Sequence, residues 1–121
     1  MTDKSIVPQK APITSHVLDT SSGKPAANLP VSLFQFVDQQ WTLLKKSETN
    51  GDGRCNDLVG IENFTSGRYK VHFFVSQYFE TTSTKSMYPF VEIVFDIENP
   101  LDHYHIPLLL SPFGYTTYRG S

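Results

Sequence analysis

GRYKVHFFV, residues 67–75, is the stretch that decides the fold class of this chain. Its side chains alternate in character, so that Tyr69, Val71 and Phe73 share one face. A period of two predicts a β-strand with one buried face and one wetter face. VSLFQFV at 31–37 and VEIVFDI at 91–97 repeat this pattern, which favours a protein built from sheets.

Further strands are predicted on both sides of this stretch. They cover residues 13–19, 41–47, 54–57, 104–111 and 115–118. Clusters of turn-forming residues at 20–25 and 50–53 separate them. Only residues 76–84 suggest a helix, a short one with Tyr78 and Phe79 on its apolar edge. About eight short strands and at most one helix predict an all-β sandwich or barrel.

Composition excludes several function classes. The 121 residues predict one domain, residues 12–121, preceded by a flexible segment, residues 1–11. A net charge of −2 without a basic run argues against nucleic-acid binding. The single cysteine, Cys55, excludes an internal disulfide and is interpreted as structural. No apolar run approaches the roughly 20 residues of a membrane helix. Residues 1–10 show no secretory signal, so we expect a cytoplasmic or peroxisomal protein.

The four histidines are the first candidates for chemistry, because imidazole exchanges protons near neutral pH. His103 and His105 share one face of a strand and could hold zinc. No third ligand has a diagnostic spacing to them, so we expect no metal and favour acid–base work by one of the pair. His72 lies in a plain amphipathic strand, which is typical of a structural or solvated histidine. His16 is a weak signal on its own.

Two other features stand out. Arg54 follows the turn at 50–53, and a guanidinium suits carbonyl or enolate oxygens, although most such arginines are merely solvated. The C-terminal residues 113–121 are rich in Tyr and Thr and directly continue a predicted strand pair. We therefore expect this tail to be tied into the sheet, with its polar end available for chemistry.

Several segments in order resemble the family of 5-hydroxyisourate hydrolases, the transthyretin-related enzymes of urate breakdown. They are ITSHVLD at 13–19 with GKPA at 23–26, NGDGR at 50–54, HYHIPLLLSP at 103–112 and the final YRGS at 118–121. The resemblance spans residues 12–121. It implies a transthyretin-like (prealbumin-like) eight-stranded β-sandwich with one short helix. It also implies a homotetramer, a dimer of dimers, with active sites at the dimer–dimer interface.

The resemblance also implies the reaction and its residues. 5-Hydroxyisourate would be hydrolysed at a cyclic amide to OHCU, on the route from urate toward allantoin, without any cofactor, metal, membrane or nucleic acid. The implied catalytic residues are His16, Arg54, His105 and Ser121, and the implied substrate-binding residues are His16, Arg54 and Tyr118. A neutral His16 or His105 would take a proton from water, and Arg54 would stabilise charge on the substrate.

The residues leave three alternatives open. Which histidine acts as the base is not decided. Strand parity directs Ser121 away from the face of His105 unless the chain end curls. A transthyretin-like carrier of small ligands without catalysis is the main alternative function, since function lives in the site rather than in the fold. A β-sandwich interaction or adhesion domain is disfavoured by the missing secretory signal and by the clustered histidines.

Overall fold

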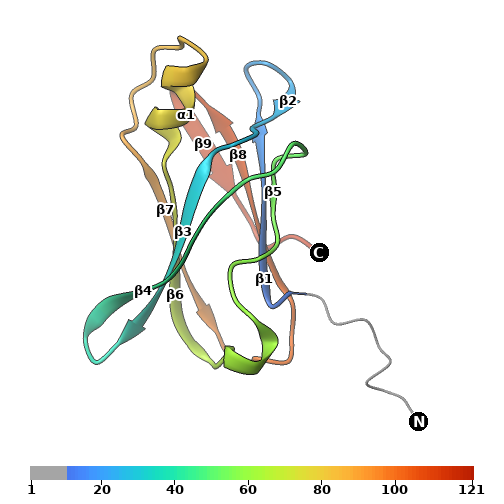
Figure 1. The fold of residues 1–121 in the computed structure, drawn as a ribbon, viewed down its shortest axis with the longest axis vertical. Helices are drawn as coiled ribbons and strands as arrows, with labels where there is room; N and C mark the ends of the chain where they lie inside the picture. The colour runs from blue at the N-terminus through green and yellow to red at the C-terminus, as the bar shows by residue number, and fades with distance from the viewer. Residues whose placement is uncertain (1–10) are drawn as a thin grey trace.

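The computed structural model describes residues 11–121, so nearly all of the predicted segment 1–11 lies outside the described residues. Two β-sheets lie face to face, and a short helix covers one end (Figure 1). The strands are β1 Ile13–Asp19, β2 Lys24–Pro25, β3 Pro30–Val37, β4 Gln40–Glu48, β5 Arg54–Cys55, β6 Gly67–Phe73, β7 Val91–Ile97, β8 Tyr104–Ser111 and β9 Gly114–Thr117. The helix is α1 Val75–Thr81, and Ile61–Asn63 forms one 3-10 turn. The all-β sandwich prediction is confirmed.

The first sheet contains β1, the strand of His16. Its strand order is β2-β1-β8-β9, and β5 also pairs with β1. The second sheet has the order β4-β3-β6-β7. β1 and β8 run parallel, whereas every other strand pair of the described chain is antiparallel. A parallel pair needs a long crossover, and here nearly the whole chain separates the two partners.

Side chains along β1 and β8 alternate between the core and the outer face of their sheet. Ile13, Val17, Leu108 and Leu110 are fully buried between the sheets. His16 and Leu18 of β1 point to the opposite face and are partly buried, as are His105 and Leu109 of β8. Burying this apolar set stabilises the sandwich by roughly 25 cal/mol per Å² of apolar area. It also fixes the strand register, because a slip of one residue would turn the buried set outward.

The helix differs in detail from its prediction. α1 begins at Val75, which the sequence pattern places in the preceding strand, and it ends at Thr81, three residues before the predicted end. Its N-cap residue, Phe74, makes no side-chain cap hydrogen bond, and the hydroxyl of Ser76 donates to the carbonyl of Pro89 at 2.8 Å. Tyr78 is buried, as predicted, and its hydroxyl donates to Oδ2 of Asp19 at 2.8 Å. This bond ties the helix to the end of β1.

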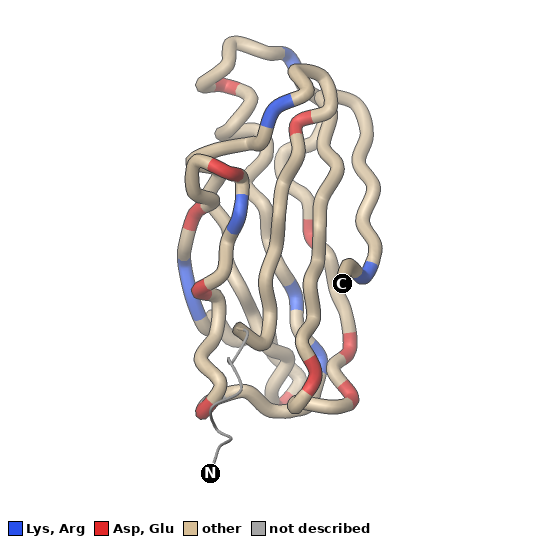
Figure 2. The backbone as a smooth tube through the Cα atoms, turned by 90° about the vertical axis from the view of Figure 1, so that its right-hand side faces the viewer, with Lys and Arg blue, Asp and Glu red and all other residues tan. Residues whose placement is uncertain are grey.

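Charged residues are spread over the molecule. Figure 2 shows Lys and Arg positions interspersed with Asp and Glu along the backbone, without a continuous basic strip. Within residues 11–121, no helix is long and apolar enough to cross a membrane.

Candidate active site

The turn before Arg54 is held by its own first residue. Oδ1 of Asn50 accepts hydrogen bonds from the backbone N–H groups of Asp52 and Arg54, at 2.9 and 3.0 Å. Gly53 has φ +76°, and its carbonyl accepts the N–H of Val17 at 2.8 Å. A Cβ at Gly53 would lie 2.6 Å from the carbonyl oxygen of Val17. Only glycine therefore lets this turn approach β1 so closely.

This close approach places Arg54 beside β1. In the antiparallel pairing of β5 with β1, Arg54 lies opposite His16. On the other side of β1, the parallel register places Thr14 opposite His105 and His16 opposite Pro107. Three segments that are distant in sequence thus present their outward side chains on one face of one sheet.

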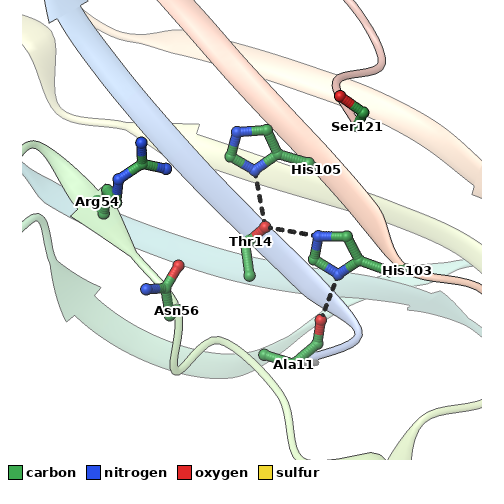
Figure 3. Close-up of a pocket in the computed structure, with 7 residues that line it drawn as sticks. All are labelled: Ala11, Thr14, Arg54, Asn56, His103, His105 and Ser121. Atoms are coloured by element: carbon green, nitrogen blue, oxygen red, sulfur yellow. Dashed lines mark hydrogen bonds between the residues drawn. The ribbon is translucent and has the colours of Figure 1, made fainter. Parts of the chain in front are cut away.

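A cavity of about 330 Å³ opens on this face (Figure 3). It is lined by Ala11, Thr14, Arg54, Asn56, His103, His105 and Ser121. The structure therefore brings together three of the predicted catalytic residues, Arg54, His105 and Ser121. His16 lies next to Arg54 in the sheet without lining the cavity. Tyr118 does not line it either, and this residue is 55% exposed.

A chain of hydrogen bonds runs along one wall of the cavity. Nδ1 of His103 lies 2.7 Å from the carbonyl oxygen of Ala11. Oγ1 of Thr14 lies 3.3 Å from Nε2 of His103 and 2.7 Å from Nδ1 of His105. The two imidazole rings are nearly parallel, with centroids 6.2 Å apart. Thr14 thus links the histidine pair at its centre, as the dashed lines in Figure 3 show.

The surroundings of His105 favour its neutral form. Burial lowers the pKa of this imidazole below its ordinary 6.5, and coulombic repulsion from the Arg54 guanidinium, and from His103 and His16 whenever they are protonated, lowers it further. Each cause penalises the imidazolium, because a charge loses solvation on burial and is repelled by like charges. At neutral pH His105 is therefore able to accept a proton.

The chain end is joined to His105 by the backbone. In the register of β8 with β9, Leu108 lies opposite Thr117, and the next position would set Pro107 opposite Tyr118. Proline has no N–H to donate, and the ladder is interrupted there. It resumes at Gly120, whose N–H donates to the carbonyl of His105 at 2.8 Å. Ser121 then lines the cavity, although strand parity alone directed it away.

Residues 11–121 contain no group of three His, Cys, Asp or Glu side chains arranged to hold a metal ion. His72 lies in the other sheet, where its Nδ1 is 2.9 Å from Oε2 of Glu92. Its ring stacks on Phe90 with centroids 4.7 Å apart. These contacts give His72 a packing role on a surface separate from the cavity.

Sequence reasoning missed two polar residues of the cavity, Thr14 and Asn56. Thr14 carried one usable signal, since it lies two residues before His16 on the same strand face. Asn56 carries none, because the sequence predicts a strand over 54–57, whereas the strand ends at Cys55.

Known proteins are similar in sequence to almost the whole chain. The model of the HIUase/Transthyretin family matches residues 13–120. A 5-hydroxyisourate hydrolase of Mus musculus is 45% identical over 115 residues, which cover 93% of this chain and 98% of that protein.

Solved structures share the fold. The crystal structure of sea bream transthyretin in complex with thyroxine superposes with a TM-score of 0.86 and 31% identity, covering 90% of this chain and 94% of that one. The crystal structure of (S)-allantoin synthase matches with a TM-score of 0.82 and 38% identity, covering 90% of this chain and 43% of that one.

Proposed function

The chain belongs to the HIUase/Transthyretin family, and we propose that it is an enzyme that hydrolyses 5-hydroxyisourate in the cavity lined by Arg54, His105 and Ser121. The observation that carries this proposal is the convergence of these three residues, from β5, β8 and the chain end, on one cavity. The 45% identity to a 5-hydroxyisourate hydrolase of matching length supports the substrate. The similarity to (S)-allantoin synthase supports a place in urate breakdown.

In the proposed reaction, His105 acts as the general base. Its lowered pKa keeps it neutral at physiological pH, and it takes a proton from water as the water oxygen attacks the ring carbonyl. Arg54 stabilises the negative charge that gathers on the carbonyl oxygen. Cleavage of the C–N bond then opens the ring, and the leaving nitrogen takes up a proton to give OHCU. His16, beside Arg54, helps to bind the substrate, and Ser121 donates a hydrogen bond that orients it.

The assembly we propose is a homotetramer, a dimer of dimers. The cavity opens on the outer face of the sheet that contains β1, β5 and β8, where His105 and Leu109 are only partly buried within their own chain. β9 and β7 also end their sheets with unpaired edges, which proteins usually cover. Tyr118 lies outside the cavity of its own chain, so its proposed contact with substrate requires a neighbouring copy. Sedimentation at micromolar concentration should give four times 13.7 kDa; a stable monomer would contradict both statements.

The function is tested by following the ultraviolet absorbance of freshly made 5-hydroxyisourate with and without the protein. EDTA is included, since the proposed chemistry uses no metal. We expect the protein to accelerate the decay of the substrate catalytically. A carrier would instead bind a ligand without accelerating its decay, and an unchanged decay rate would reject the enzymatic function.

A further inference from the structure

Thr14 occupies an unusual position between two imidazole rings. Its hydroxyl oxygen lies 2.7 Å from Nδ1 of His105 and 3.3 Å from Nε2 of His103, and the residue is only 7% exposed. A hydroxyl group has one proton to donate and lone pairs with which to accept. If the hydroxyl donates to one histidine, it accepts from the other. The direction of the two hydrogen bonds therefore has to be determined.

The direction of these hydrogen bonds is set by Ala11, at the far end of the hydrogen-bonded chain. The carbonyl oxygen of Ala11, 2.7 Å from Nδ1 of His103, can only accept, so Nδ1 of His103 carries a proton. In neutral His103 the other nitrogen, Nε2, then has a lone pair and can only accept. The Thr14 hydroxyl donates to it, and its oxygen is left to accept from Nδ1–H of His105.

The consequence falls on the reactive side of His105. A neutral imidazole carries one proton, so a proton on Nδ1 leaves Nε2 as an acceptor. Figure 3 shows this second nitrogen on the side of the ring that faces Arg54 in the view. Gly120 lies against the adjacent Cδ2 edge, where an added Cβ would come within 2.6 Å, so the ring has little room to turn over.

We propose that Thr14 is a positioning residue. It links His105 to His103, which is itself bonded to the backbone carbonyl of Ala11, and it thereby holds His105 in the tautomer with an unprotonated Nε2. This proposal rests on the proposed function for its catalytic meaning, because only a base needs that nitrogen bare. The tautomer of His105 can be measured independently of any assay of hydrolysis. The role is distinct from substrate contact, since Thr14 acts through the imidazole of His105.

The test combines nitrogen NMR with kinetics. In ¹⁵N-labelled protein at pH 8, long-range proton–nitrogen spectra identify which ring nitrogen of His105 is protonated. We expect the Nδ1–H form in the wild type and in Thr14→Ser, which keeps the hydroxyl. Thr14→Val keeps the shape and removes the hydroxyl, and its His105 should move toward the Nε2–H form. Thr20→Val is the matched control: its hydroxyl also bonds along the β1–β8 pair, to the carbonyl of Leu110, but at the other end of β1.

Kinetics supply the second readout. Thr14→Val should lower kcat for 5-hydroxyisourate by about ten- to a hundredfold with little change in KM, and Thr14→Ser should restore most of it. The Nε2–H form in the folded wild type, or an unchanged tautomer and kcat in folded Thr14→Val, would overturn the proposal. Absence of hydrolysis in the wild type would reject the proposed function alone, because the spectra would still report the tautomer.

Discussion

Gly120 lies against both the backbone and the imidazole ring of His105. The N–H of Gly120 donates to the His105 carbonyl at 2.8 Å. A Cβ at Gly120 would lie 2.6 Å from Cδ2 of the imidazole and 3.1 Å from Cγ of Pro107. The last residues of the chain therefore help to fix the position of the proposed base, in addition to bringing Ser121 to the cavity.

Gly120→Ala should consequently impair catalysis without unfolding the protein. The new methyl group must displace the imidazole, and a misplacement of about 1 Å can cost on the order of a hundredfold in rate. We expect kcat/KM to fall by at least about tenfold. Gly51→Ala is the control, because nothing lies within 4 Å of a Cβ at that position. Equal rates for the two folded variants would show that the ring tolerates the contact.

Arg54 should have two separable effects, one on the reaction and one on His105. Arg54→Lys keeps the positive charge and loses the planar two-pronged donor, so we expect a loss of about 10²–10³-fold in kcat/KM with the pKa of His105 still lowered. Arg54→Gln removes the charge, and the pKa of His105 should rise toward 6.5. An NMR titration of His105 in the two variants measures this difference. If both variants titrate alike, the charge of Arg54 does not act on His105.

The pH profile follows from the lowered pKa of His105. The base works only when neutral, so kcat/KM should fall as the pH drops through a pKa that lies below 6.5. The same shift lowers stability in acid, because the unfolded imidazole binds a proton more readily than the folded one. This loss begins as the pH falls below about 6.5 and grows until the folded group also titrates. An acid limb of kcat/KM centred above pH 7 would exclude His105 as the base.

The bond between Tyr78 and Asp19 should stabilise the fold without affecting catalysis. Burial alone would raise the pKa of Asp19, but hydrogen bonds from Ser21, Tyr78 and Ser22 outweigh it and lower the pKa. Burial and Asp19 together raise the pKa of Tyr78 to about 12. Tyr78→Phe removes one donor from the carboxylate of Asp19, a residue that is 3% exposed, and should cost about 1–3 kcal/mol of unfolding free energy in urea.

This stabilisation has a pH signature of its own. Because the folded pKa of Asp19 is lowered, its contribution is complete above the ordinary value of 3.8 and is lost as the pH falls through the folded value. The difference in stability between wild type and Tyr78→Phe should therefore shrink in acid. A difference that stays constant down to pH 2 would mean that the ionised carboxylate is not the partner that matters.

The sequence predicts most of the strands because their alternation is strong. β1, β7 and β8 have the predicted bounds. Every second residue is buried in β1 and β8, and in β7 the same alternation leaves Ile93 and Phe95 partly buried. The errors occur where one residue satisfies two patterns. Val75 is apolar in the predicted strand and equally buried in α1. The strand over 54–57 ends at Cys55, since Asp57 turns to accept the hydroxyl of Ser47 at 2.7 Å.

The site is predictable only in part, for a different reason. His16, Arg54, His105 and Ser121 are suggested by family resemblance, which compares positions along the chain. The link from Thr14 to His105 spans 91 residues and exists only through the parallel pairing of β1 with β8. Antiparallel neighbours are often joined by a short turn and can be guessed, whereas a crossover of this length leaves the register unspecified until the sandwich forms.

The central claim, that the cavity of His105 carries the chemistry, is tested most directly by kcat/KM for 5-hydroxyisourate in His105→Ala. His72→Ala serves as the control, because His72 lies in the other sheet and contacts Glu92 and Phe90. A catalytic base contributes about 10²–10⁴-fold, so His105→Ala should lose at least about a hundredfold while His72→Ala stays near wild type. A folded His105→Ala protein that remains within about threefold of wild type would contradict the account and place the chemistry elsewhere.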